Sequence, residues 1–221
     1  FSKNKLKDNC LKMTSFFNSY VDKFKNQQVP EIKNKVIYDA KLICWSRNLF
    51  NNISRGKYSK FDEKNIRTTL YRPFTKTNLY YTKDFNDECG RIKSIFPDAN
   101  SLNKIICLSG IGSKEFSVIM TDTIPDRQLM FNGQNFPLKL YYQSNNDEGI
   151  GTLNLFNDNQ NTSSGIGRIF RESLKDLPYS EIINDEDIFF YIYGILHSNQ
   201  YREKFKNNLL KSFPRIPFVK T

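Results

Sequence analysis

The spacing of hydrophobic residues changes along this chain. Apolar residues recur at helical spacing near both ends, whereas the middle holds short runs typical of strands. Residues 9–26 form the first helical pattern, which Pro30 ends. A second helical pattern runs over residues 36–53, and Gly56 follows it as a stop signal.

The middle of the chain predicts short strands separated by turns. Residues 66–70 and 79–81 flank a turn-forming segment at 72–78, and a short helix is expected near 85–95. Further extended runs cover 104–108, 116–121 and 137–142, with a glycine-containing turn at 109–113. Residues 143–167 are polar and rich in turn formers, so they predict a loop or linker.

The C-terminal part predicts two helices. Asn184 or Asp185 can cap the first, and Glu186 and Asp187 in its first turn suit the helix dipole. Ser198 can cap a second helix, which Pro214 stops. The expected fold class is therefore α+β (in the broad sense α/β): a mixed β-sheet body with flanking helices and a C-terminal antiparallel helix pair over residues 185–211.

Positive charge is concentrated toward the ends of the chain. The formal net charge is +10, and residues 1–100 hold 20 Lys and Arg against 10 Asp and Glu. Residues 101–200 hold 7 against 12, and residues 201–221 hold 6 against 1. This pattern favours a protein that meets a polyanion on one face. Lys-rich chains are also common in AT-rich genomes, and charge alone does not separate DNA from RNA or anionic lipid.

The residues that an autonomous enzyme or a metal site would need are missing from the sequence. There is no GxxxxGK[ST] phosphate loop, and Gly110-Ile111-Gly112 lacks the third glycine of a dinucleotide fingerprint. Four scattered cysteines and the single His197 form no metal-ligand cluster, so we expect no metal and no catalytic residue. With no secretion signal and no membrane-spanning run, a cytoplasmic protein with reduced thiols is expected.

Several stretches together resemble one family. They are residues 69–74 (Thr-Leu-Tyr-Arg-Pro-Phe) with 79–81, residues 116–122, residues 135–141, and residues 186–198 continuing through 201–204 to Pro-Arg-Ile-Pro-Phe at 214–218. The set resembles the C-terminal target-recognition region of type ISP restriction–modification enzymes, in which one polypeptide also carries a nuclease, a helicase and an adenine methyltransferase. The resemblance covers about residues 36 to 219.

The resemblance implies a non-catalytic fragment, cut from a longer chain, that recognises a duplex DNA sequence. It would direct adenine methylation and ATP-dependent translocation and cleavage by other domains, which would bind S-adenosylmethionine, ATP and Mg²⁺. Its partners would be double-stranded DNA and the methyltransferase and helicase domains. Residues 1–34 would be a helical linker from the parent chain, and residues 35–221 the recognition domain. An alternative is a structural module that couples helicase to methyltransferase, and a third is an RNA-binding module.

Candidate DNA-contacting residues lie in the turns and loops. The candidates for phosphate contact are Arg55, Lys57, Lys60, Arg72 and Lys76. For Arg72 a buried structural ion pair is an equal alternative, and for the residues after position 54 a solvated charge run is an alternative. The candidates for reading base edges are the loop amides Asn78, Asn132, Gln134, Gln143, Asn145 and Asn146.

Overall fold

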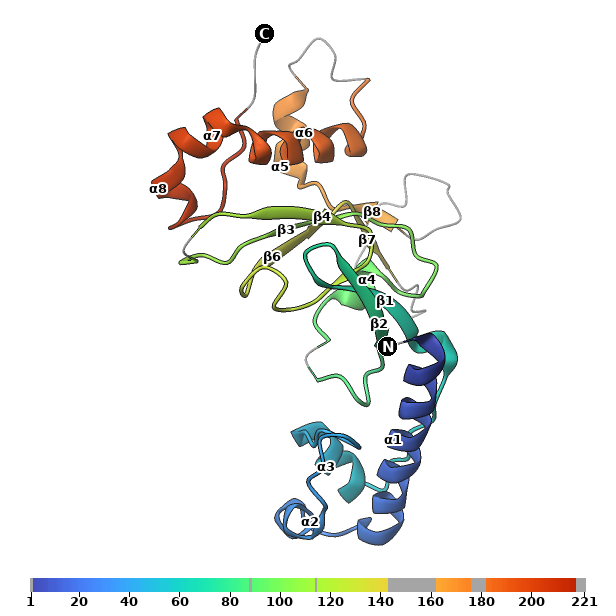
Figure 1. The fold of residues 1–221 in the computed structure, drawn as a ribbon. Helices are drawn as coiled ribbons and strands as arrows, with labels where there is room; N and C mark the ends of the chain where they lie inside the picture. Colours follow the sequence, from blue (N-terminus) through green and yellow to red (C-terminus); the bar gives the residue numbers. More distant parts are fainter. Residues whose placement is uncertain (1, 88, 114, 143–161, 176–181, 218–221) are drawn as a thin grey trace. The chain divides into compact units, whose positions relative to one another are not determined.

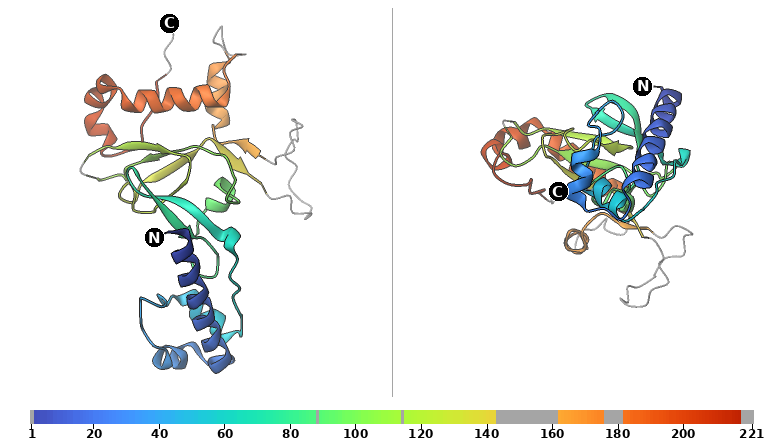
Figure 2. Two further views of the ribbon diagram at one scale, coloured as in Figure 1. Left: turned by 45° about the vertical axis from the view of Figure 1, so that its right-hand side comes forward. Right: turned by 90° about the horizontal axis from the view of Figure 1, so that it is seen from below.

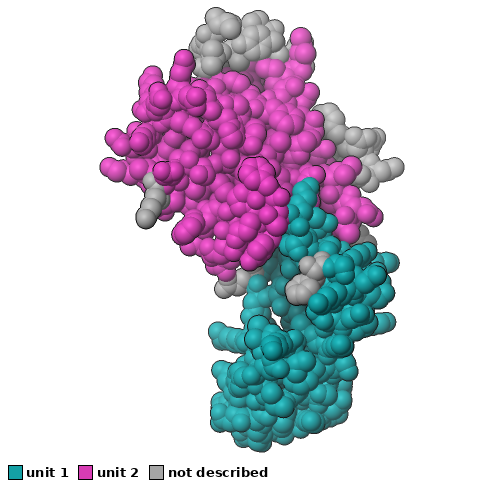
Figure 3. Space-filling view, viewed as in Figure 1, with its two compact units in different colours: residues 1–69, 76–90 teal, residues 70–75, 91–221 magenta. Residues whose placement is uncertain are grey.

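The computed structural model describes residues 2–87, 89–113, 115–142, 162–175 and 182–217, which form helices and small sheets (Figures 1 and 2). The predicted α+β class is confirmed. The chain divides into two compact units (Figure 3). Unit 1 comprises residues 1–69 and 76–90, and unit 2 comprises residues 70–75 and 91–221.

The described residues of unit 1 contain three helices, each of which has a residue typical of helix N-termini at or near its start. They are α1 (Lys3–Phe24), α2 (Val29–Lys35) and α3 (Arg47–Ser54). The hydroxyl of Ser2 caps α1 and that of Ser46 caps α3. Pro30 lies in the first turn of α2, where a missing N–H is harmless, so it separates two helices as well as ending the first pattern.

The core of unit 1 is aromatic and joins all three helices. Its fully buried members include Phe17 and Val21 of α1, Ile32 of α2 and Ile53 of α3. Trp45 stacks on Phe50 at 5.4 Å between ring centroids. Side chains of α1 and α2 thus share one core with side chains of the segment 36–53. The division of the parent chain at residue 34 stays a prediction.

The helix predicted over residues 36–53 is wrong for its first half, since only α3 is helical. Ile37 donates its N–H to the Tyr20 hydroxyl at 3.2 Å and accepts a bond from the Trp45 indole at 2.9 Å. The Asp39 carboxylate accepts from the Lys41 N–H at 2.9 Å. These side-chain partners compete with helical hydrogen bonds and hold the segment as a loop.

A β-hairpin follows, as the sequence predicts. After the short 3-10 helix η1 (Glu63–Asn65), strands β1 (Ile66–Arg72) and β2 (Thr75–Tyr80) enclose the two-residue turn of Pro73 and Phe74. Buried Ile66 and Tyr80 pack with Cys10 of α1 in a second small core of unit 1. The tip of the hairpin, residues 70–75, belongs to unit 2.

The β-sheet body that we expected consists of small sheets. The helix predicted near 85–95 is only the short α4 (Ile92–Ile95). Strand β3 (Ile105–Leu108) lies between β4 (Val118–Thr121) and β6 (Gln134–Pro137) and is antiparallel to both. Strand β7 (Lys139–Tyr141) forms an antiparallel pair with β8 (Thr162–Ser164), and the short β5 (Ile124–Pro125) adjoins β1. All four residues of β3 are buried, which raises the pKa of the Cys107 thiol to about 12.

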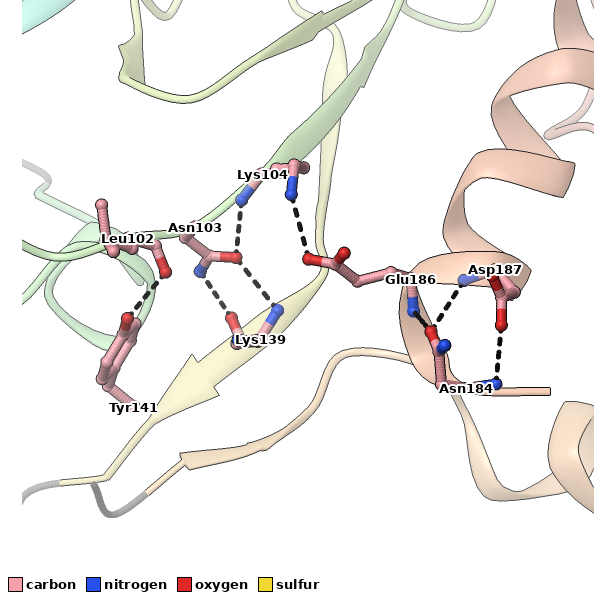
Figure 4. Close-up of polar contacts among 8 residues, drawn as sticks. All are labelled: Leu102, Asn103, Lys104, Lys139, Tyr141, Asn184, Glu186 and Asp187. Carbon is pink, nitrogen blue, oxygen red and sulfur yellow. Dashed lines mark hydrogen bonds and ion pairs between the residues drawn. The ribbon is translucent and has the colours of Figure 1, made fainter. Parts of the chain in front are cut away.

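A buried asparagine ties the sheets of unit 2 together (Figure 4). The Asn103 amide nitrogen donates to the carbonyl oxygens of Ile95 at 3.0 Å and Lys139 at 2.8 Å. Its amide oxygen accepts from the N–H groups of Lys104 at 2.8 Å and Lys139 at 3.1 Å. Asn103 therefore satisfies backbone groups of α4, β7 and the residue before β3 with one side chain.

The C-terminal helices cover one face of the β4-β3-β6 sheet (Figures 1 and 2). Helix α6 (Asp185–His197) begins at the predicted cap, where Asn184 and Asp187 form a reciprocal capping box (Figure 4). Phe189 and Leu196 of α6 are buried against Ile106 and Leu108 of β3. Helix α5 (Arg168–Leu174), which the sequence did not predict, has no buried residue.

The predicted second C-terminal helix is divided. Ser198 caps α7 (Asn199–Lys204) as expected, and α8 (Lys206–Leu209) follows after Phe205. Both lead away from the end of α6, so the expected antiparallel pair does not form (Figures 1 and 2). The hydroxyls of Tyr191 and Tyr201 donate to the carbonyl oxygens of Pro217 and Arg215, at 2.6 and 2.9 Å. These bonds hold the segment after Pro214 against the helices.

Candidate nucleic-acid interface

The hairpin tip holds Arg72 in a defined position. Its guanidinium carbon lies 4.1 Å from the centre of the Tyr71 ring. One guanidinium nitrogen donates to the Tyr71 carbonyl oxygen at 2.8 Å and approaches the Asp126 carboxylate to 3.5 Å. The Arg72 side chain is nevertheless 47% exposed. It therefore has a carboxylate partner, but the pair is not buried as the structural alternative predicted, and the side chain remains open to solvent, as phosphate contact requires.

The loop after β5 is tightly organised although it contains no regular element. Asp126 accepts from the Gln128 N–H through its carboxylate at 2.8 Å and from the Leu129 N–H through its carbonyl at 3.0 Å. The Gln128 amide nitrogen donates to the Asn132 side-chain oxygen at 3.1 Å. Phe131 and Asn132 both have left-handed backbones, with φ of 53° and 54°.

Two glycines allow this loop to pack backbone to backbone against the turn after β3. A Cβ atom on Gly110 would lie 2.6 Å from the Phe131 carbonyl oxygen, and one on Gly133 would lie 2.0 Å from that of Leu108. Both distances are far inside normal contact, so neither position accepts a side chain without a backbone shift. Close packing thus fixes where Asn132 and its neighbour Phe131 are presented. Gly110 and Gly112 form a turn, the structural reading that the sequence favoured.

Three predicted site residues share unit 2. Arg72 lies at the hairpin tip, Asn132 is exposed in the loop, and Gln134 is exposed on β6, opposite Leu108 of β3. Gln134 thus lies in a strand and not, as expected, in a loop. The predicted positions Gln143, Asn145 and Asn146 lie outside the described residues. Two site residues were not predicted from the sequence: Asp126, which contacts Arg72, and Gln128, which contacts Asn132. The dipeptide Pro125-Asp126 is a turn signal that could have indicated Asp126.

The remaining predicted residues belong to unit 1, which carries 17 Lys and Arg against 9 Asp and Glu, compared with 16 against 14 in unit 2. Arg55 and Lys60 follow α3, are exposed, and have no side-chain ion pair with any described residue. Lys76 is exposed and Asn78 half-buried on β2, and each has an interaction within the chain. Nothing in the structure tests their roles, which stay predictions.

Lys57 has a local carboxylate partner. Its ammonium group lies 2.9 Å from one Asp84 oxygen, and the Ser59 hydroxyl donates to the other at 2.8 Å. Burial alone would raise the pKa of the Asp84 carboxyl group. The hydrogen bonds from Lys57 and Ser59, with the charges of Lys57 and Lys83, instead lower this pKa below its ordinary value. Any phosphate contact by Lys57 would therefore compete with Asp84.

The described residues do not bring metal-binding side chains together. They contain no group of three or more His, Cys, Asp and Glu side chains placed to hold a metal ion. His197 lies against the Tyr193 ring at 4.5 Å, and burial and the Arg202 charge lower its pKa. Among the described helices, none is both long and apolar enough to cross a membrane.

A comparison with known proteins identifies the family of this chain. The family described as "Type ISP C-terminal specificity domain" matches residues 1–221, the whole chain. The chain belongs to this family. The resemblance carried by the sequence motifs is thereby confirmed, and the match also includes residues 1–35, which the motifs did not reach. Among curated proteins, none matches this specificity domain.

Solved structures resemble this specificity domain over almost its whole length. The cryoEM structure of the DrdV–DNA complex has a TM-score of 0.81 and 26% identity, covering 99% of this chain and 20% of that one. The type ISP enzyme LlaBIII bound to DNA has a TM-score of 0.77, 31% identity and coverage of 100% and 13%. A nuclease-deletion mutant of LlaGI, a type ISP enzyme in complex with a DNA substrate mimic, has a TM-score of 0.77 and 28% identity, covering 100% of this chain and 16% of that one. The specificity domain therefore spans at most a fifth of the length of these proteins.

Proposed function

We propose that this chain is the sequence-specific duplex DNA recognition domain of a type ISP restriction–modification enzyme. It directs adenine methylation and ATP-dependent translocation and cleavage, which other domains perform. Those domains bind S-adenosylmethionine, ATP and Mg²⁺, and this chain is non-catalytic. Its partners are double-stranded DNA and the methyltransferase and helicase domains.

The observation that carries the proposal is the likeness of the whole chain to three proteins whose structures hold DNA. The geometry of unit 2 supports it, because an exposed arginine and two exposed amides lie on tightly held backbone. Amides read adenine through both their donor and their acceptor. The Asn132 oxygen already accepts from Gln128, whereas the Gln134 side chain has no hydrogen bond to a described residue. Gln134 is therefore the stronger candidate for reading a base.

The decisive experiment measures duplex binding by this chain at two salt concentrations, using fluorescence anisotropy. If all five predicted phosphate contacts form, counterion release lowers the affinity about 500-fold for a fourfold rise in salt. Salt-independent binding, or no binding at low salt, would contradict the proposal. An RNA duplex of the same sequence is the matched control, and tighter binding to it would favour the RNA-binding alternative. The site itself can be read by sequencing the modified bases of the host genome.

The coupling role also has one observation in its favour. Unit 2 contains a pocket of about 370 Å³ between the β4-β3-β6 sheet and α6, lined by apolar side chains such as Phe189 and Ile192. Among the described residues that line it, Gln134 has the one polar side chain, so the same residue borders both candidate surfaces. Apolar surface of this kind can mark a contact with another domain. A module that only couples domains would show no steep salt dependence in the anisotropy experiment, so the same measurement separates the two roles.

A further inference from the structure

Two phenylalanines of unit 2 combine features that proteins usually avoid together. Phe74 is 94% exposed and Phe131 is 80% exposed. Both also have left-handed backbones, with φ of 64° and 53°. A bulky residue with positive φ is a conformational outlier, and an exposed phenyl ring gains nothing from burial. Such a pairing of strain and exposure points to a task performed with a partner.

The backbone around each ring is fixed. Phe74 is the second residue of the two-residue turn between β1 and β2, where its positive φ suits glycine or asparagine. Pro73 before it restricts the backbone further. Phe131 lies in the loop that packs against Gly110, whose N–H donates to the Met130 carbonyl oxygen at 3.3 Å. Both rings are therefore held out on rigid turns.

The two turns are linked within unit 2. The Asp126 N–H donates to the Leu70 carbonyl oxygen at 3.0 Å, and its carboxylate faces Arg72 at 3.5 Å. Asp126 begins the loop that presents Phe131, and Arg72 precedes the turn that presents Phe74. Each ring thus accompanies a predicted DNA-contacting residue: Phe74 is two residues after Arg72, and Phe131 is directly before Asn132.

We infer that Phe74 and Phe131 are apolar wedges that enter DNA and stack on bases at the recognition site. The inference rests on the proposed function, because DNA is the partner that the neighbouring arginine and amide would contact. Phenylalanine side chains inserted between base steps unstack them and kink the duplex. Because the free energy needed to kink DNA depends on its sequence, the rings would add specificity to the base contacts made by Gln134.

The backbone supplies a sharp test, since glycine prefers the conformation that each phenylalanine adopts. Phe74→Gly and Phe131→Gly should leave the thermal stability of the chain unchanged or higher. If each ring stacks on a base, its loss should weaken duplex binding about 5- to 150-fold. The salt dependence of binding should not change, because no phosphate contact is lost. Phe74→Tyr keeps a ring and should restore the affinity.

The insertion itself can be followed with 2-aminopurine, a fluorescent base analogue, placed at successive positions of a duplex. The duplex carries the recognition site that sequencing of the modified bases identifies. Its fluorescence should rise on binding at the unstacked step, and this rise should vanish in the glycine variants. Leu102→Ser is the matched control, because Leu102 is 83% exposed with no left-handed backbone, and it should change nothing.

The outcomes separate this inference from the proposed function. If the unmodified chain fails to bind duplex DNA, both fall. If it binds with the expected salt dependence but the glycine variants bind equally well and the 2-aminopurine signal persists, the wedge role alone is overturned. The exposed rings would then be contacts for another protein surface.

Discussion

The two units of the molecule differ in what they offer to DNA. Unit 1 carries most of the excess positive charge around an aromatic helical core, with exposed side chains such as Arg55 and Lys60 after α3. Unit 2 is nearly balanced in charge, and its candidate groups Arg72, Asn132 and Gln134 lie on a hairpin tip, a closely packed loop and a strand. Charge without fixed geometry binds any phosphate backbone, whereas fixed amides can distinguish bases. The difference therefore suggests a division between affinity in unit 1 and specificity in unit 2.

Substitutions in the hydrophobic cores of units 1 and 2 test whether the two units unfold independently. Phe17 is fully buried in the core of unit 1, and its replacement by alanine should cost about 3–5 kcal/mol in the free energy of unfolding. Trp45, the single tryptophan, packs in that core and reports its unfolding by fluorescence in urea. Phe189→Ala removes an equally large ring from the core of unit 2. If it shifts the Trp45 transition as much as Phe17→Ala does, the units unfold as one.

Local signals in the sequence predicted much of this architecture. The Asn184 cap, the Ser198 cap and the hairpin at 66–81 follow from short-range chemistry, and each is confirmed. Errors arose where distant partners decide the structure. Residues 36–46 carry a helical apolar pattern, but Tyr20 and Trp45 anchor Ile37 as a loop. Strand β6 has exposed residues and forms because β3 pairs with it.

The candidate interface was only partly predictable for the same reason. Arg72 and the amides at 132 and 134 could be chosen by residue type and turn context. That Arg72 faces Asp126, 54 positions away, depends on the pairing of the hairpin with β5. The left-handed backbone of Phe131 depends on contact with the turn at Gly110. No local pattern in the sequence encodes these long-range contacts.

The specificity assigned to unit 2 can be tested at Gln134. Gln134→Ala should cost about 1–3 kcal/mol of binding free energy for the methylated site and relax the choice of one base pair. Binding to unrelated duplexes should not change. Asn135→Ala is the matched control, since successive strand residues face opposite sides and Asn135 is also exposed on β6. Equal losses in both variants, or a uniform loss across all sequences, would contradict base reading by Gln134.

The affinity assigned to unit 1 can be tested at Arg55 and Lys60. At physiological salt, glutamine at either position should weaken binding to every duplex about fivefold, and the double variant should lower the salt slope by about 2. Lys57→Ala should also weaken all duplexes alike, but by less, since Lys57 is paired with Asp84. A sequence-dependent loss in any of these variants would place specificity in unit 1 and contradict the division of roles between the units.

The stability of unit 1 should depend weakly on pH through Asp84. The pKa of Asp84 is lowered from 3.8, so the folded form holds its proton less tightly than the unfolded chain does. The stabilisation is therefore complete above pH 3.8 and is lost as the pH falls through the lowered pKa. Asp84→Asn should remove this acid-dependent part of the stability that Trp45 fluorescence reports. Asp8→Asn serves as the control, since Asp8 is exposed in α1 and its carboxylate has no hydrogen bond or ion pair with a described residue. Lys57→Ala should shrink the same acid dependence, because it removes the main hydrogen-bond donor to Asp84. If Lys57→Ala leaves the acid dependence intact while weakening DNA binding, the ammonium group serves DNA rather than Asp84.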